Sequence, residues 1–224
     1  MKTLVKGAVS AALGLVAFGL MLFLPAGTFH YWQAWVFLAV FAFYTWIPSV
    51  YLVRKNPAAL ERRMHAGPLA ETRTLQQIVS TVVFICFPAM LVVSALDHRF
   101  GWSPVPTTVT VVGDILVAVG LGVAMLVVAQ NGYAAANITV ESGQTLVSTG
   151  LYGLVRHPMY SGSVIMMVGV PLALDSYWGL VFVIPALVAL ALRIRDEEEF
   201  LQQQLSGYSD YEQQVRYRLV PYVW

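Results

Sequence analysis

The chain has 224 residues, of which 58% are hydrophobic and only 11% are charged, and its formal net charge is +1. Soluble domains usually carry about 25% charged residues, so this composition excludes a soluble globular enzyme, a disordered chain and a nucleic-acid-binding protein. The single cysteine, Cys86, excludes a disulfide framework and a CxxC metal or redox site. The composition therefore predicts a polytopic membrane protein.

The hydrophobic residues are grouped in blocks, and about 20 residues suffice to cross a bilayer core of about 30 Å as a helix. In chain order the longer blocks occupy residues 7–24, 31–53, 78–96 and 108–129, and two shorter runs follow at 160–174 and 178–192. Only three residues separate the two shorter runs, which therefore predict one tightly turned hairpin. We expect an all-α fold of four spans plus a C-terminal helical hairpin, with residues 1–224 forming a single integral-membrane domain.

The distribution of Lys and Arg predicts the orientation of this bundle. Twelve of the thirteen Lys and Arg residues fall on one side of the membrane in the expected topology, and Arg99 falls on the other. Because positive residues concentrate in cytoplasmic loops, both termini are expected to face the cytoplasm. The first block is longer than the 7 to 15 residues of a signal-peptide core, so we interpret it as a span rather than a cleaved leader.

The densest group of reactive side chains is the motif Arg156-His157-Pro158-Met159-Tyr160-Ser161-Gly162, at the start of the fifth run. Proline suits the first turn of a helix, and the residue before proline is disfavoured in the helical conformation. His157 is therefore expected to cap a helix whose N-terminus favours an anion. The alternative is that Arg156 contacts lipid phosphates while His157 only caps the helix.

A second charged group, residues 193–199, follows the sixth run. These residues could form a functional site or simply the solvated face of a helix. Residues 158–174 and 178–194 would each form a helix of about 25 Å. If these two helices fold antiparallel, Glu197 returns to the level of His157. Ionisable groups that meet at the membrane boundary indicate a functional site. Such a site suits a zwitterionic ligand with an aromatic part, whereas no metal is expected because His157 has no second histidine at ligand spacing.

These motifs resemble the isoprenylcysteine carboxyl methyltransferase family of integral-membrane enzymes, in its bacterial branch. The similarity begins near Asn137, runs through residues 143–152 and the RHPxYxG string at 156–162, and continues through the EExxL string at 197–201 to Pro221. The first half resembles the family only in its hydrophobic layout and in the loop at 56–63. A related pattern occurs in membrane phospholipid N-methyltransferases and, more distantly, in sterol reductases.

The resemblance implies an S-adenosylmethionine-dependent methyltransferase, with the cofactor held by residues 130–224 on the cytoplasmic face of a bacterial inner membrane. It implies in-line methyl transfer to a lipophilic small molecule or lipidated group, most simply a carboxylate, with membrane lipid around the protein and no obligate protein partner. Arg156 and Glu198 are the implied catalytic residues. The implied cofactor-binding residues are His157, Tyr160, Glu197, Glu198, Gln144, Leu146, Val147, Gly150, Leu151 and Tyr152.

Several alternatives remain open at this point. The methyl acceptor could be an amine, for which His157 or a glutamate would serve as the base. The protein could be a sterol-reductase-like membrane enzyme that uses NADPH, or a non-catalytic membrane component or transporter. For a lipid substrate we expect entry between the block at 108–129 and the C-terminal hairpin.

Three glycines of the fourth block, Gly113, Gly120 and Gly122, are expected to permit close helix packing. Gln130 and Asn131, which end this block on the cytoplasmic side, are candidates for lining the cofactor entrance.

Overall fold

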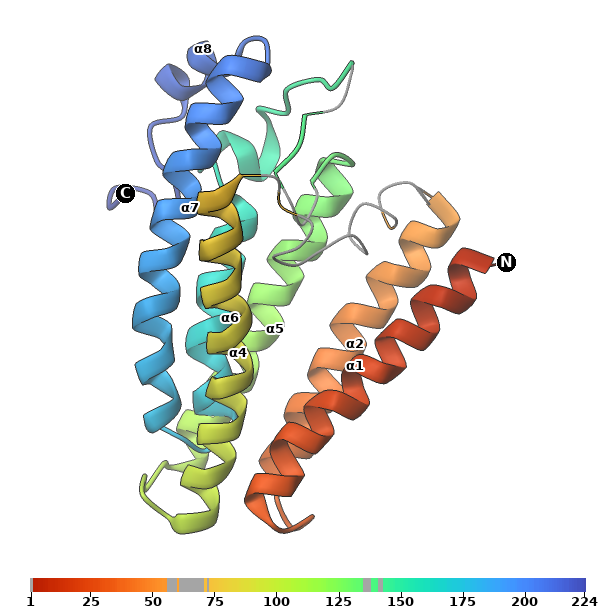
Figure 1. Cartoon of the computed structure of the whole chain (residues 1–224), viewed down its shortest axis with the longest axis vertical. Coiled ribbons are helices and arrows are strands. Elements are labelled where there is room, and N and C mark those ends of the chain that lie inside the picture. The colour runs from red at the N-terminus through yellow and green to blue at the C-terminus, as the bar shows by residue number, and fades with distance from the viewer. Residues whose placement is uncertain (1, 56–59, 61–70, 72, 135–137, 141–142) are drawn as a thin grey trace.

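The computed structural model describes residues 2–55, 60, 71, 73–134, 138–140 and 143–224, with side chains in the first helix from Val9 onward. The described chain is helical and contains no strand, as expected (Figure 1). Its elements are α1 (Lys2–Ala26), α2 (Trp32–Lys55), α4 (Thr74–Phe100), α5 (Thr107–Gln130), η2 (Gly150–Gly153), α6 (Pro158–Ala173), η3 (Trp178–Phe182), α7 (Val183–Gln204) and α8 (Tyr208–Gln214).

Five helices in the described part are long and apolar enough to cross a membrane, and α6 is a shorter apolar helix. The five candidate spans are Val9–Ala26, Trp32–Lys55, Thr74–Phe100, Thr107–Gln130 and Trp178–Gln204. Their outer faces leave large apolar side chains exposed, among them Leu13, Phe84 and Ile184. This pattern fits a multi-pass membrane protein in which α6, η3 and α7 form the expected C-terminal hairpin.

The two ends of the bundle differ in character (Figure 1). At one end, here called the turn end, short connections join α1 to α2, α4 to α5, and α6 to α7. The other end, here called the polar end, carries η2, α8 and both chain termini. Arg99 lies at the turn end, where its Nη1 donates to the carbonyl of Pro25 at 3.2 Å. The described side chains of the other Lys and Arg residues lie in the segments of the polar end.

The turn end is fixed by buried polar contacts. Asp97 is only 1% exposed, and its carboxylate accepts hydrogen bonds from the Ser176 hydroxyl at 2.6 Å and the Ser103 hydroxyl at 2.7 Å. The Tyr31 hydroxyl donates to the carbonyl of Leu174 at 2.5 Å, which connects the residue before α2 to the end of α6. These bonds satisfy backbone and side-chain groups at the bend between α6 and α7, which lies where the sequence predicted it.

Helices α5 and α6 pack with their backbones in contact. A Cβ atom added at Gly162 would lie 2.7 Å from the carbonyl oxygen of Gly120, and one added at Gly169 would lie 2.8 Å from that of Gly113. The packing role predicted for Gly113 and Gly120 is therefore confirmed. Because these backbones touch, the expected entry of substrate between the fourth block and the hairpin is wrong.

Gly122 does not take part in this contact. A Cβ atom there would meet only the Tyr44 ring, at an ordinary 3.6 Å, so the prediction of close packing fails at this position. The reason is that Gly122 faces the Tyr44 ring of α2 rather than the backbone of α6.

Helix α7 continues well past the apolar run that ends at residue 192. Its last part carries the charged residues 193–199, and Arg193, Asp196 and Glu198 are buried. Hydrophobicity marks the part of a helix that lies in lipid, whereas the helix itself continues as long as its backbone bonds and contacts are satisfied. The extension carries the acidic residues alongside the start of α6.

Candidate active site

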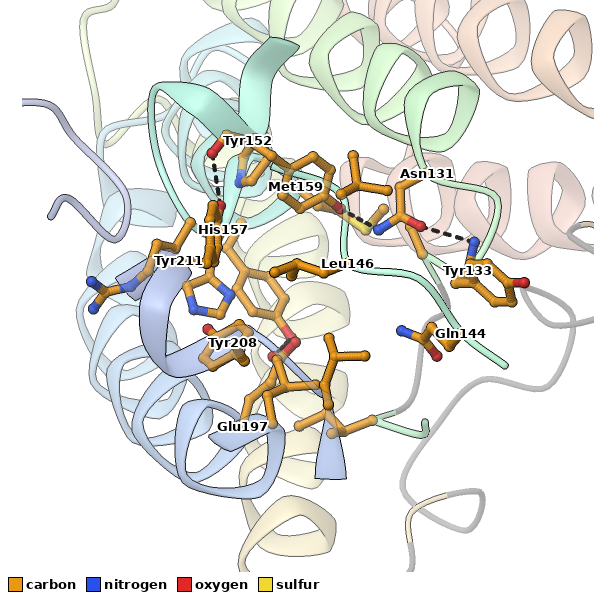
Figure 2. Close-up of a pocket in the computed structure, with 18 of the residues that line it drawn as sticks. Asn131, Tyr133, Gln144, Leu146, Tyr152, His157, Met159, Glu197, Tyr208 and Tyr211 are labelled. Atoms are coloured by element: carbon orange, nitrogen blue, oxygen red, sulfur yellow. Dashed lines mark hydrogen bonds between the residues drawn. The ribbon is translucent and has the colours of Figure 1, made fainter. Parts of the chain in front are cut away.

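A cavity lies at the polar end, between the end of α5, the first turn of α6, the charged part of α7 and α8 (Figure 2). Its lining combines charged groups, amides, tyrosines and aliphatic side chains. The lining residues are Asn131, Tyr133, Ala134, Ile138, Thr139, Gln144, Thr145, Leu146, Val147, Tyr152, Arg156, His157, Pro158, Met159, Tyr160, Arg193, Glu197, Leu201, Leu205, Tyr208 and Tyr211.

Most of the predicted site residues meet at this cavity. Those that line it are Gln144, Leu146, Val147, Tyr152, Arg156, His157, Tyr160 and Glu197. Glu198, Gly150 and Leu151 are not among its lining residues. The Leu151 amide donates to the Oε1 atom of Gln130 at 3.1 Å, and Gly150 also lies against that side chain. The structure thus brings Gly150 and Leu151 to Gln130 rather than to the cavity, whereas Asn131 does line it.

The start of α6 forms one wall. Pro158 occupies the first turn and His157 the capping position, as the sequence predicted. The amide groups of Arg156 and His157 donate to the carbonyls of Tyr217 at 2.8 Å and Arg218 at 2.9 Å, so the C-terminal segment holds the motif in place. The first turn of α6 lines the cavity, which puts the positive end of the helix dipole beside any ligand there.

Glu198 connects three segments behind this wall. Its carboxylate is 4% exposed and accepts from the Nε atoms of Arg156 and Arg218, both at 2.7 Å, and lies 3.2 Å from the Nε2 atom of His157. Arg156 also donates through Nη1 to the carbonyl of Val215 at 3.0 Å. The carboxylate of Glu198 is therefore occupied by groups of the protein itself and does not face the cavity.

Glu197 is the acidic residue that faces the cavity, and Figure 2 shows its side chain there. One carboxylate oxygen accepts from the Tyr160 hydroxyl at 2.6 Å. That hydroxyl in turn accepts from the Nε atom of Arg193 at 2.9 Å. Of the two adjacent acids that the resemblance implied as cofactor-binding, Glu197 is therefore the one that faces the cavity.

Tyrosines form the wall toward α8 (Figure 2). Burial raises the pKa values of Tyr152, Tyr208 and Tyr211 above the ordinary value, so all three phenols stay neutral. Tyr211 donates to the Tyr152 carbonyl at 2.7 Å, and the Asn131 amide donates to the Tyr152 hydroxyl at 3.1 Å. In the described part of the chain, the buried Tyr208 hydroxyl has no hydrogen-bond partner.

Sequence reasoning missed the residues that hold α7 from the side of α4. Arg73 forms a 2.7 Å ion pair with Asp196, and Gln76 donates to the same carboxylate. Ser80 accepts a hydrogen bond from α7, and the buried Glu71 also pairs with that helix. Arg73, Gln76 and Ser80 are spaced by three and four residues, so this polar stripe at the start of an apolar helix was a usable signal.

Comparison with known proteins finds a family that matches part of the chain. Residues 108–207 match the model of the phospholipid methyltransferase family. The matched region is a little under half of the chain, and it contains every lining residue named above except Tyr208 and Tyr211. The match supports a membrane methyltransferase.

A second similarity is to a reductase. Over 90 residues, which are 39% of this chain, the sequence is 33% identical to the Delta(14)-sterol reductase TM7SF2 of Mus musculus. The alignment covers 22% of the reductase, so the chain spans about a fifth of that protein's length.

Proposed function

We propose that the protein is an S-adenosylmethionine-dependent methyltransferase that acts at the membrane on a lipophilic substrate. The observation that carries this proposal is the cavity at the polar end, where the N-terminus of α6, the Glu197 carboxylate and neutral tyrosines line one space. The family match over residues 108–207 supports it. The cofactor would supply a methyl group activated by a positively charged sulfur.

The chemistry of the lining fits this cofactor. The carboxylate of S-adenosylmethionine suits the positive N-terminus of α6. The ammonium group of S-adenosylmethionine suits the negative charge of Glu197. Leu146, Val147 and Tyr152 offer apolar and aromatic contact to an adenine ring. A polar atom of the ligand would also satisfy the Tyr208 hydroxyl, whose burial without a partner is otherwise costly.

We assign different roles to the two residues that the resemblance implied as catalytic. Arg156 lines the cavity, and its guanidinium is bound by Glu198, Glu212 and the Val215 carbonyl, so we assign it to shaping this wall rather than to binding the acceptor. Glu198 acts as a positioning residue, because its carboxylate holds Arg156 and His157 in place from behind the wall.

The surroundings of the site favour a carboxylate acceptor, such as that of an isoprenylcysteine-like molecule, over an amine. A protonated amine must lose a proton before it can attack, and the candidate bases are His157 and the two glutamates. His157 and Glu198 lie within hydrogen-bond distance of each other, and Arg156 and Arg218 also bind the Glu198 carboxylate. A carboxylate needs no base, and its charge is neutralised as it accepts the methyl group.

A groove between α2 and α5 suits the hydrocarbon part of such a substrate. Helix α2 diverges from α5 toward the polar end in Figure 1, and a cavity lies between the two helices. At its polar end, Leu52, Leu60 and Val128 pack together with Met159, which also lines the first cavity. We therefore propose that the acceptor's tail occupies this α2–α5 groove. The remaining groove residues are Tyr44, Thr45, Pro48, Ser49, Leu121, Ala124 and Met125.

The site is proposed to face the cytoplasm. The Lys and Arg residues at the polar end support this orientation, because the positive side of a multi-pass protein is retained in the cytoplasm. Substrate would then reach the groove from the inner leaflet.

The similarity to the mouse Delta(14)-sterol reductase favours one alternative, a membrane reductase that uses NADPH. Both hypotheses are tested by titrating the purified protein in detergent with S-adenosylhomocysteine and, in parallel, with NADPH. We expect saturable binding of S-adenosylhomocysteine and none of NADPH. The variant Tyr208→Phe should bind S-adenosylhomocysteine more weakly without unfolding. Binding of NADPH alone would overturn the proposal.

A further inference from the structure

Glu71 is a buried acid that precedes α4 and lies outside the matched region 108–207. Its side chain is 4% exposed, and its Oε1 atom lies 2.8 Å from the Nη2 atom of Arg193. The Glu71 carbonyl accepts from the Gln77 side chain at 2.8 Å, which fixes the backbone beside α4. A buried carboxylate without a cation would cost several kcal/mol, so Glu71 and Arg193 depend on each other.

Arg193 lies four residues before Glu197 on α7, so both side chains project from the same face of the helix. At this spacing an arginine and a glutamate readily form an ion pair. The charge of Arg193 does act on Glu197, but its guanidinium forms an ion pair and hydrogen bonds with Glu71, with α4 and with α6. Its Nη2 atom pairs with Glu71, its Nη1 atom donates to the Ser80 hydroxyl at 2.7 Å, and its Nε atom donates to the Tyr160 hydroxyl.

The formal charges of Glu71, Arg193 and Glu197 sum to one negative charge, and Glu197 is the member that lines the cavity. We propose that Glu71 balances the positive charge of Arg193, so that the Glu197 carboxylate is left to pair with the ammonium group of the cofactor. Glu71 is then a positioning residue, because it acts on ligand recognition through Arg193 without contacting the ligand. The inference rests on the proposed function and adds a requirement that lies outside the matched region.

The test compares two ligands on the Glu71→Gln variant. S-adenosylhomocysteine carries the ammonium group, whereas 5′-methylthioadenosine has the same adenosine and sulfur without the amino-acid part. The variant should bind S-adenosylhomocysteine about tenfold more weakly, equivalent to about 1.4 kcal/mol, and 5′-methylthioadenosine as the wild type does. Glu199→Gln is the matched control, since it removes one negative charge from an exposed position of α7 and should change neither affinity.

A second variant distinguishes this role from a merely structural one. In Glu71→Gln/Arg193→Gln, no guanidinium remains to neutralise Glu197, so S-adenosylhomocysteine should bind more tightly than it does to Glu71→Gln alone. A further loss of affinity in the double variant would overturn the inference, as would equal weakening of both ligands in the single variant. If Glu71→Gln fails to fold, the double variant, in which both buried charges are absent, must still bind S-adenosylhomocysteine. Failure of the wild type to bind S-adenosylhomocysteine would overturn the proposed function itself.

Discussion

The substitution Glu198→Gln removes a buried negative charge while it keeps the shape of the side chain. In the wild type, this carboxylate accepts from Arg156 and Arg218 at 2.7 Å and lies 3.2 Å from the His157 ring nitrogen. Breaking a buried pair by removing one partner typically costs about 3 to 5 kcal/mol. Because glutamine retains one acceptor oxygen and Arg156 keeps its bond to the Val215 carbonyl, we expect the lower end, about 3 kcal/mol.

A loss of this size should be plain in thermal unfolding. For a chain of this length, each 1 kcal/mol shifts the melting temperature by about 2 to 4 °C, so Glu198→Gln should melt about 6 to 12 °C lower. The assay is intrinsic tryptophan fluorescence of detergent-solubilised protein during heating. Glu199→Gln, an exposed neighbour on the same helix, should stay within about 0.5 kcal/mol of the wild type.

Glu197→Gln gives the contrasting result. This side chain lines the cavity and has the Tyr160 hydroxyl as a donor, so its neutralisation should weaken S-adenosylhomocysteine binding with little change in melting temperature. The reasoning would be refuted if Glu198→Gln melted like the wild type yet lost ligand binding while Glu197→Gln kept it. That result would reverse the roles assigned to the two acids.

Three further substitutions test the packing, the groove and the turn end. Gly120→Val should lower stability by about 2 kcal/mol or more in the melting assay, because the valine side chain would overlap the Gly162 backbone. Gly122→Ala should be nearly neutral in the same assay, because the nearest atom to the added Cβ lies at 3.6 Å. Ala124→Trp should raise the KM for a lipid acceptor and leave S-adenosylhomocysteine affinity unchanged, and an unaltered KM would argue against the α2–α5 groove. Asp97→Asn should lower the melting temperature without changing ligand affinity, since this carboxylate lies at the opposite end of the bundle; a loss of affinity at equal stability would contradict that separation.

The part of the site that the sequence could predict is the part set by local rules and helix length. Pro158 fixes the start of α6, and a short hairpin returns the acidic residues of α7 to the same level. The contacts of Arg156 and His157 with Glu198 confirm that the two charged ends meet. What spacing could not decide was which of two adjacent acids faces the cavity, because that depends on how α7 is rotated against α6.

Contacts across the bundle were beyond sequence reasoning. Glu71 and Arg193 are separated by more than half of the chain, and their pairing depends on α4 packing beside α7. Gly150 and Leu151 were predicted to bind the cofactor because they share a motif with Gln144 and Tyr152, whereas the turn at η2 directs them to Gln130. In both cases the deciding interaction joins residues with no regular spacing between them.

Transfer of a labelled methyl group to a membrane lipid would be the direct sign of methyltransferase activity. Membranes containing the protein are incubated with S-adenosylmethionine labelled with tritium in its methyl group, and the lipids are then extracted into organic solvent. We expect label to enter the organic phase with the wild type and to fall to the background of protein-free membranes with Glu197→Gln. Mild alkaline hydrolysis should release the label, as expected of a methyl ester. Equal label in the organic phase from the wild type and Glu197→Gln, or none from either, would contradict the proposed function.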